Sequence, residues 1–138
     1  FEPILYGWRE GATRHWCGAR DQGDVWNIKK PHKNDLHPTM KPVELVERAV
    51  RNSSRPGDIV LDSFGGSGTT MIASEKSDRK ARLIELDPKY VDVIVRRWQD
   101  YAGAQATRQS DGVAFDALVS EPGGLENREA VGRVANES

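Results

Sequence analysis

Residues 58–70 read DIVLDSFGGSGTT, a short apolar run that ends in a glycine-rich turn. The β-branched run Ile59–Leu61 is typical of a buried parallel strand. The glycines Gly65, Gly66 and Gly68 allow positive backbone φ angles, and they let a ligand approach the main chain where a Cβ would block it. The following residues continue into a helix, whose first amide groups point outward toward such a ligand. This stretch therefore predicts a strand, a turn able to bind a ligand, and a helix.

The flanking sequence adds further helices and strands around this centre. Apolar residues recur at helical spacing from Pro42 to the breaker pair Pro56-Gly57, and again from Pro88 to Tyr101. Residues 82–86 form a second strand-like run, and the Asp that follows it is placed to cap the last of these helices. Helix, strand, helix, strand and helix at these lengths predict an α/β fold with parallel strands and right-handed crossovers.

A carboxylate lies close to the glycine turn in this arrangement. Glu85 ends the second strand, and ligands of open parallel sheets bind at the carboxyl ends of the strands. Neighbouring strands lie about 4.8 Å apart, so we expect Glu85 beside the turn, where it can accept both hydroxyls of a ribose. The turn and the acid together favour an adenosine-containing cofactor. The alternative is an ordinary strand-to-helix turn followed by a solvated strand end.

Two common phosphate-binding patterns fit this turn poorly. The dinucleotide pattern could start at Gly66, but its third glycine falls where the chain has Met71. The phosphate-loop pattern needs a Lys after the last glycine, and none follows Gly68.

Length and composition limit the class of protein. The chain has 138 residues, with 20 Lys and Arg against 21 Asp and Glu, which suits one small domain without a uniformly basic surface. The single cysteine, Cys17, excludes an intramolecular disulfide and a cysteine-based zinc site, and the three histidines form no ligand cluster, so we expect no metal. A lone cysteine also suits a reducing compartment, so we expect a cytoplasmic location. No apolar run approaches the roughly 18–20 residues of a membrane helix, so we expect no membrane partner.

The first 36 residues are basic and aromatic, and they lose periodicity after a short apolar opening, with at most short strands around Val25–Ile28. Two interpretations remain open: a surface loop whose Trp residues pack on the domain, or a surface that contacts nucleic acid through phosphates and stacking. The candidate nucleic-acid residues are Arg9, Arg14, Trp16, Arg20, Lys29, Lys30 and Lys33.

The last segment, residues 103–138, is polar and acidic, with three Arg against six Asp and Glu. A weak apolar patch, Val113–Val119, is expected to fold back on the domain, and we expect disorder beyond Glu121.

Three motifs together resemble a known family. They are HPTMKP at residues 37–42, LDSFGGSGTT at 61–70 and IELDPKY at 84–90. In this order and spacing they resemble the cofactor region of S-adenosylmethionine-dependent DNA amino-methyltransferases, the N6-adenine/N4-cytosine enzymes of the permuted β class. The opening FEPILYG also looks like the late strand that precedes target recognition in this family, so the likeness runs from Phe1 to about Tyr101.

The resemblance implies an organisation for the whole chain. It implies a Rossmann-like methyltransferase fold with an incomplete sheet. Residues 1–36 would form a late strand and a target-recognition-like segment, residues 37–102 the S-adenosylmethionine-binding core, and residues 103–138 the tail.

The resemblance also assigns roles to residues. The loop before the first helix would hold the methionine end of the cofactor, Asp62 would face its amino group, Phe64 would lie against it, and Glu85 would bind the ribose. For Asp87 we favour helix capping over a ligand role, and His37 would shape its loop. Ser63 departs from the family, which usually has Pro there. The implied cofactor residues are Pro38, Thr39, Lys41, Asp62, Phe64, Gly65, Gly66, Ser67, Gly68, Thr69 and Glu85.

The catalytic tetrapeptide of the family, Asp/Ser/Asn-Pro-Pro-aromatic, is absent, since no Pro-Pro pair occurs in the sequence. We therefore assign no catalytic residue and expect the chain to be the carboxyl-terminal part of a larger enzyme. The strand that carries the tetrapeptide would pair beside residues 58–62, so its absence would expose a sheet edge. The parent is expected to methylate an exocyclic amine of double-stranded DNA within a restriction-modification system, either adenine N6 or cytosine N4, with adenine favoured as the commoner activity of the family. The chain alone should lack transferase activity and be marginally stable.

Two other function classes remain possible. One is a non-catalytic nucleic-acid-binding module on the same fold. The other is an oxidoreductase with a nucleotide cofactor and an unusual glycine turn.

Overall fold

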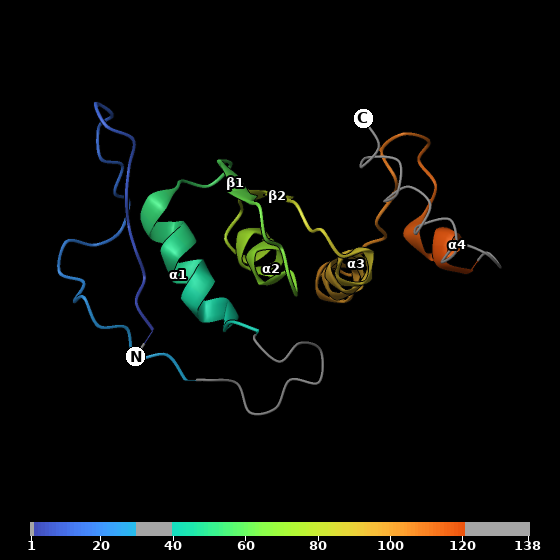
Figure 1. Ribbon diagram of the computed structural model, residues 1–138, viewed down its shortest axis with the longest axis horizontal. Coiled ribbons are helices and arrows are strands. Elements are labelled where there is room, and N and C mark those ends of the chain that lie inside the picture. Colours follow the sequence, from blue (N-terminus) through green and yellow to red (C-terminus); the bar gives the residue numbers. More distant parts are fainter. Residues whose placement is uncertain (1, 30–39, 121–138) are drawn as a thin grey trace, which may run out of the picture.

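The computed structural model describes residues 2–29 and 40–120, and these contain four helices and two strands (Figure 1). The helices and strands are, in chain order, α1 (Val43–Ser53), β1 (Ile59–Asp62), α2 (Thr69–Lys76), β2 (Lys80–Leu83), α3 (Pro88–Ala102) and α4 (Phe115–Ser120). The predicted order of helices and strands is confirmed. The strands pair in parallel, with Ile59 opposite Lys80 and Asp62 opposite Leu83.

The second strand lies earlier in the chain than predicted. It was expected at residues 82–86, but β2 ends at Leu83. Ile84 still donates its backbone N–H to the Asp62 carbonyl, and its own carbonyl accepts from Gly65. Ile84–Leu86 therefore form the connection to α3, which frees Glu85 from the strand and lets its side chain turn to the glycines.

Local signals in the sequence set where α3 begins and ends. Asp87 accepts a hydrogen bond from the Lys89 backbone N–H (2.9 Å), and Pro88 follows as the first helical residue. Gly103 closes the helix with a φ of 62°. Asp87 is thus a helix cap, as favoured from the sequence.

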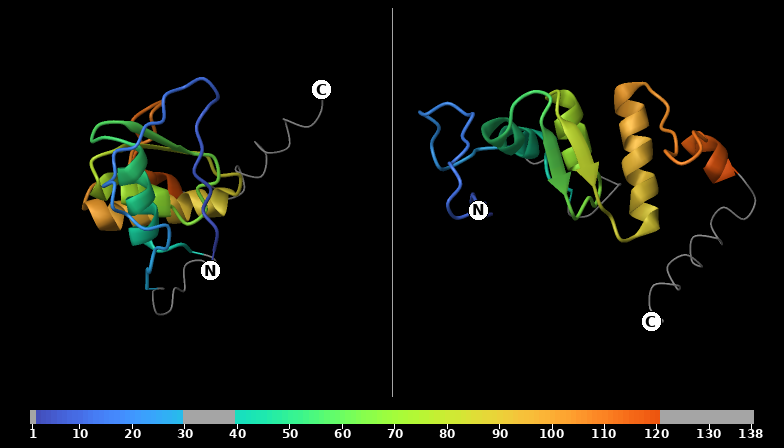
Figure 2. Two further views of the ribbon diagram at one scale, coloured as in Figure 1. Left: turned by 90° about the vertical axis from the view of Figure 1, so that its left-hand side faces the viewer. Right: turned by 90° about the horizontal axis from the view of Figure 1, so that it is seen from above.

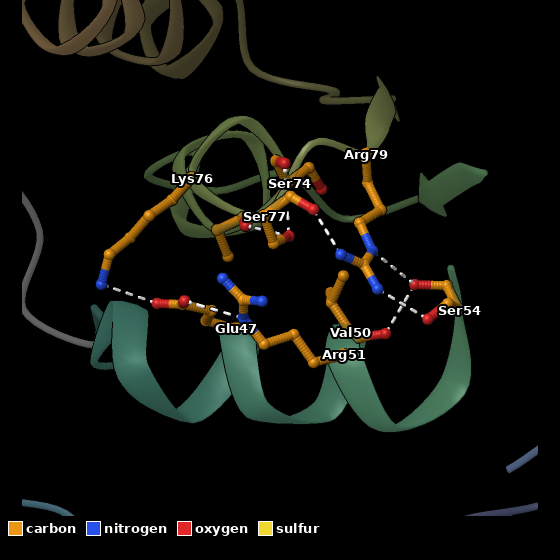
Figure 3. A network of polar contacts seen from close by, with 9 residues as sticks. Glu47, Val50, Arg51, Ser54, Ser74, Lys76, Ser77 and Arg79 are labelled. Carbon is orange, nitrogen blue, oxygen red and sulfur yellow. Dashed lines mark hydrogen bonds and ion pairs between the residues drawn. The ribbon is translucent and has the colours of Figure 1, made fainter. Parts of the chain in front are cut away.

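A buried arginine ties α1, α2 and β2 together (Figure 3). Arg79, 8% exposed, donates to the Ser54 hydroxyl (3.1 Å), to the Ser54 carbonyl (2.7 Å) and to the Ser77 carbonyl. The Ser54 hydroxyl in turn donates to the Val50 carbonyl (2.6 Å). The guanidinium therefore satisfies carbonyl groups left open where both helices end.

A second polar contact joins the same two helices (Figure 3). Glu47 on α1 pairs with Arg51 (3.0 Å) and with Lys76 on α2 (2.7 Å). Burial by itself raises the pKa of the Glu47 carboxyl, but the hydrogen bonds from Lys76 and Arg51 outweigh it and hold the pKa below its usual value. The contact therefore stabilises the fold at neutral pH and is lost as the pH falls through that lowered pKa.

One face of the two-stranded sheet is covered and the other is bare. The helices α1, α2 and α3 all lie below the strands in Figure 1, and the small core gathers on that side around Val50, Ile72 and Ile94. On the opposite face Ile59 is 64% and Leu61 66% exposed. The prediction of a buried β1 is therefore wrong for one face, because no described residue covers those side chains.

The tail folds back as far as it is described. Thr107 and Ala114 form an antiparallel bridge, and Phe115, 8% exposed, lies beneath the Arg96 guanidinium, 6.0 Å from the ring centroid. α4 thereby docks beside α3, as the apolar patch in this segment predicted. The expectation of disorder beyond Glu121 lies outside the described residues.

Candidate cofactor site

Glu85 and the glycine turn meet at the carboxyl edge of the sheet. Glu85 Oε2 accepts a hydrogen bond from the Gly66 N–H (2.7 Å), and Oε1 accepts from the Asp87 N–H (3.0 Å). The carboxylate is half-buried. The sequence therefore placed it correctly beside the turn, although it also serves as an acceptor for the turn's own backbone.

The three positions of the turn require glycine for different physical reasons. A Cβ on Gly68, whose φ is 77°, would lie 3.1 Å from two Ile94 carbons, and one on Gly65 would lie 3.1 Å from Ile94 Cδ1. These two glycines let α3 pack closely against the turn. At Gly66, with a φ of 53°, a Cβ would meet only the Phe64 carbonyl oxygen, at 3.8 Å, among the described residues. Gly66 is thus the glycine with open space above it.

Asp62 holds the turn in shape. Its Oδ1 accepts from the Phe64 N–H (3.0 Å) and its Oδ2 from the Thr70 hydroxyl (2.6 Å). Phe64 follows on the turn and is 89% exposed, an unusual position for a large apolar residue.

Lys41, in the segment before α1, contacts the residue that follows the turn. Thr69 donates its hydroxyl to the Lys41 carbonyl (3.3 Å), while the Lys41 ammonium pairs with Glu2 (2.6 Å). Pro38 and Thr39, the other two residues expected at the methionine end of the cofactor, lie outside the described residues. Lys41 is therefore beside the turn through its backbone, with its side chain directed to the N-terminal segment.

One residue at this site was missed by sequence reasoning. Arg97 on α3 donates to the Ser67 carbonyl (2.9 Å) and to the Thr69 hydroxyl (3.3 Å). It is half-buried, and burial lowers the pKa of its guanidinium from the ordinary value. Its only sequence signal is the spacing of three residues from Ile94 on the apolar face of the helix.

Two hollows lie near these residues. A groove of about 1630 Å³ runs between the N-terminal segment and α1, and it includes Lys41. A smaller hollow of about 240 Å³ is lined by Glu85, Pro88, Val91, Asp92, Val95 and Phe115. The glycine turn lines neither of them. Glu85 thus borders the smaller hollow, whereas Gly66 lies outside both of them, at the edge of the turn.

The N-terminal segment, residues 2–29, carries an aromatic cluster. The Arg14 guanidinium lies 5.4 Å from the ring centroid of Tyr6, 5.6 Å from that of Trp8 and 5.5 Å from that of Trp16. Arg14 and Trp16 are thus brought together. Arg9, Arg20 and Lys29 are exposed, whereas Lys30 and Lys33 lie outside the described residues. The short strands considered for Val25–Ile28 and the strand-like opening are irregular, because no strand among the described residues pairs with them.

Contacts with α1 fasten this segment to the core. The amides of Gln22 and Asn52 bond reciprocally, at 2.8 and 2.9 Å, and the Cys17 N–H donates to the Asn52 carbonyl (2.8 Å). Arg48 adds a cation–π contact, 4.4 Å above the Trp26 ring centroid. Asn52 is only 3% exposed. The segment therefore packs on α1 through polar contacts, which leaves most of its cationic side chains at the surface.

A family model described as DNA methylase matches residues 13–96. The chain belongs to this family of S-adenosylmethionine-dependent DNA amino-methyltransferases. The matched range includes β1, the glycine turn, Glu85 and most of the N-terminal segment, so the motif resemblance is confirmed and the incomplete sheet is part of a Rossmann-like methyltransferase fold.

Individual relatives agree with the family. The type II methyltransferase M.Cfr9I of Citrobacter freundii is 40% identical over 99 residues, which are 71% of this chain and 33% of that protein. The DNA adenine methyltransferase YhdJ of Escherichia coli is 35% identical over 100 residues, 70% of this chain and 34% of that protein. The crystal structure of the M1.HpyAVI–SAM complex is 31% identical with a TM-score of 0.51, covering 59% of this chain and 43% of that one. The methylase chain thus spans about a third of the length of the curated relatives it matches.

Two kinds of feature are absent from the described part of the chain. In residues 2–29 and 40–120, no group of three His, Cys, Asp or Glu side chains is arranged to hold a metal ion. Over the same residues, every helix is too short or too polar to cross a bilayer.

The two kinds of glycine predict different costs of substitution. Gly66→Ala should destabilise the fold by about 1 kcal/mol, the strain of a left-handed alanine. Gly68→Ala should cost about 1–3 kcal/mol more, because its Cβ also overlaps Ile94. Urea denaturation of both variants measures the difference. Equal losses would contradict the assignment of Gly68 to packing and Gly66 to the open edge.

Proposed function

We propose that this chain forms the cofactor-binding part of a DNA methyltransferase that moves a methyl group from S-adenosylmethionine to an exocyclic amine of DNA, adenine N6. The observation that carries the proposal is the Glu85–Gly66 hydrogen bond, which sets a carboxylate beside open backbone at the edge of a parallel sheet. Family membership supports the reaction class, and the adenine target is supported by the name of the YhdJ relative.

The cofactor would use three features of this edge. Glu85 accepts the backbone N–H groups of Gly66 and Asp87, and an ionised carboxylate is an acceptor with several lone-pair positions, so its side chain would also take the two ribose hydroxyls. Gly66 leaves its backbone open to the ligand, and the exposed Phe64 ring would gain cover by packing on the nucleoside. Asp62, Gly65, Ser67, Gly68, Thr69 and, from the preceding loop, Pro38, Thr39 and Lys41 complete the proposed site.

The ribose assignment predicts unequal effects of two neighbouring acids. Glu85→Ala should weaken S-adenosylmethionine binding at least about tenfold, because it removes a charged acceptor. Asp87→Ala should lower stability by about 1 kcal/mol through loss of the cap and leave affinity nearly unchanged. Calorimetric titration of both variants, with Glu85→Gln to separate charge from shape, makes the comparison. Equal effects, or a wild-type preference for a dinucleotide over S-adenosylmethionine, would contradict it.

We also propose that the N-terminal segment contacts the DNA. Its cationic side chains lie at the surface while Asn52 and Arg48 hold the segment on α1, so phosphates could reach them without unfolding the contact. The proposed residues are Arg9, Arg14, Trp16, Arg20, Lys29, Lys30 and Lys33. Arg14 would act together with its three rings, which offer a surface on which a base can stack.

The salt dependence of DNA affinity reports the number of phosphate contacts that a protein makes. The double variant Arg20→Ala/Lys29→Ala should bind duplex DNA more weakly and reduce the slope of log affinity against log salt by about two. The control, Arg55→Ala/Lys80→Ala, removes the same charge outside the segment. Fluorescence anisotropy at several salt concentrations gives both slopes. A control that loses as much as the test variant would exclude a specific role for the segment.

Transfer itself would need a further segment. The bare sheet face, with Ile59 and Leu61 largely exposed, and the relatives' threefold greater length support a companion that covers this face and supplies the Pro-Pro tetrapeptide. The target base would leave the stack, at a cost of a few kcal/mol. Its amine lone pair would then attack the sulfonium methyl carbon, the carbon–sulfur bond would break toward sulfur, and the amine would release one proton. Positioning supplies the rate in such a transfer, without a metal. We place the reaction in the cytoplasm, within restriction-modification.

Reconstitution tests whether this chain binds the cofactor while a companion segment supplies the tetrapeptide. The chain alone should bind S-adenosylmethionine without methylating DNA. The chain joined to the corresponding amino-terminal segment of M.Cfr9I should transfer labelled methyl groups to duplex DNA, and nucleoside analysis identifies N6-methyladenine or N4-methylcytosine. The same fusion with Glu85→Ala is the control. A folded fusion that binds cofactor and DNA but transfers nothing would favour a non-catalytic nucleic-acid-binding module.

A further inference from the structure

The helix after the glycine turn begins without a capping side chain of its own. Gly68 is the N-cap of α2 and makes no side-chain bond there. The polar groups around it are instead held from the neighbouring helix α3, which lies beside α2 (Figures 1 and 2), because Arg97 donates to the Ser67 carbonyl and the Thr69 hydroxyl. Ser67 and Thr69 are 7% and 6% exposed, so these bonds lie largely out of water.

The tip of the turn is held from two sides. Glu85 accepts the N–H of Gly66, and one residue later Arg97 donates to the carbonyl of Ser67. The Glu85 carboxylate thus binds a backbone N–H, and the Arg97 guanidinium binds the backbone carbonyl of the next residue. Glu85 lies between β2 and α3 and Arg97 lies on α3. Gly66 is therefore held at its own N–H and at the carbonyl of the next residue, which keeps its backbone at the sheet edge.

The same arginine also reaches the segment before α1. Thr69 receives the Arg97 bond and donates its own hydroxyl to the Lys41 carbonyl, at 3.3 Å in each case. One chain of hydrogen bonds therefore runs from α3 through the first residue of α2 to the segment that leads into α1. These three parts of the sequence are separated by 28 residues at each step.

We propose that Arg97 is a positioning residue for the cofactor site, which rests on the proposed function. It acts through the turn and through Thr69, holding Gly66 and Lys41 at one edge before the ligand arrives. Preorganisation of this kind raises affinity because the ordering cost is met during folding. Lys can replace only part of this role, since it carries a point charge in place of a planar fork with several donors.

The chain supplies a matched control. Arg96 is adjacent on α3, carries the same charge and is exposed, with its guanidinium over the Phe115 ring instead of the turn. Substituting it tests loss of charge and of helix propensity without touching Ser67 or Thr69. Thr69→Val removes only the hydroxyl that links Arg97 to Lys41, with little change in volume.

The experiment compares Arg97→Ala, Arg97→Lys, Thr69→Val and Arg96→Ala by calorimetric titration with S-adenosylmethionine and by thermal unfolding. Arg97→Ala should lose about tenfold or more in affinity. Arg97→Lys should recover part of that loss, Thr69→Val should fall between, and Arg96→Ala should bind like the unsubstituted chain. A folded Arg97→Ala with unchanged affinity would overturn the proposal. So would Arg97→Lys binding no better than Arg97→Ala at equal stability.

Hydrogen exchange without ligand keeps this inference separate from the proposed function. Exchange at residues 65–70 should quicken in Arg97→Ala and stay unchanged in Arg96→Ala, whatever the ligand. If the unsubstituted chain fails to bind S-adenosylmethionine while exchange responds this way, the proposed function fails and the hold on the turn stands. Unchanged exchange at residues 65–70 in Arg97→Ala would overturn the inference. If Arg97→Ala is too unstable to measure, exchange is measured in Arg97→Lys, and unchanged exchange there would overturn it in the same way.

Discussion

The hydrogen bond from the Gly66 amide to the Glu85 carboxylate is the contact on which the rest of this site depends. It exists because β1 and β2 are parallel and in register, so that the two segments leaving their carboxyl ends emerge side by side. The same carboxylate accepts the Asp87 N–H just before α3, so one side chain joins the turn to the start of the next helix. Opposite it, Arg97 holds the Ser67 carbonyl from the body of α3. The turn is thereby kept at the sheet edge with Gly66 open.

The small core explains both what the fold provides and what it leaves unfinished. The three larger helices lie on one side of a two-stranded sheet, below the strands in Figure 1, and the other side presents Ile59 and Leu61 to solvent. A two-stranded sheet is marginal by itself and gains stability from what packs on its faces. Here Arg79 and Glu47 supply polar links between α1 and α2 that partly compensate for the few buried apolar side chains. The fold therefore presents an apolar sheet face next to the edge where Glu85 and Gly66 meet.

Particular residues show how far sequence reasoning reached. Asp87 was identified as a cap and Glu85 as a neighbour of the turn, because both depend on short spacing and on the rule that ligands gather where parallel strands end. The sequence identifies the glycines of the turn as a group. Why each position requires glycine depends on where Ile94 lies, because it packs on Gly65 and Gly68 and leaves Gly66 open. Arg97 and Asn52 were overlooked, since each acts on a residue about 30 positions away. The sequence indicates Arg14 as a cationic candidate, but only the tertiary structure brings Tyr6, Trp8 and Trp16 around its guanidinium.

The sequence by itself determined the order of helices and strands, the family and the segment that turns between β1 and α2, because these follow from local periodicity, capping and motif spacing. The tertiary structure decided which side chains hold that turn, which glycine is open and which sheet face is uncovered. Those features depend on the packing of α3 against α2 and of residues 2–29 against α1, and such contacts between distant segments leave no periodic trace in the chain.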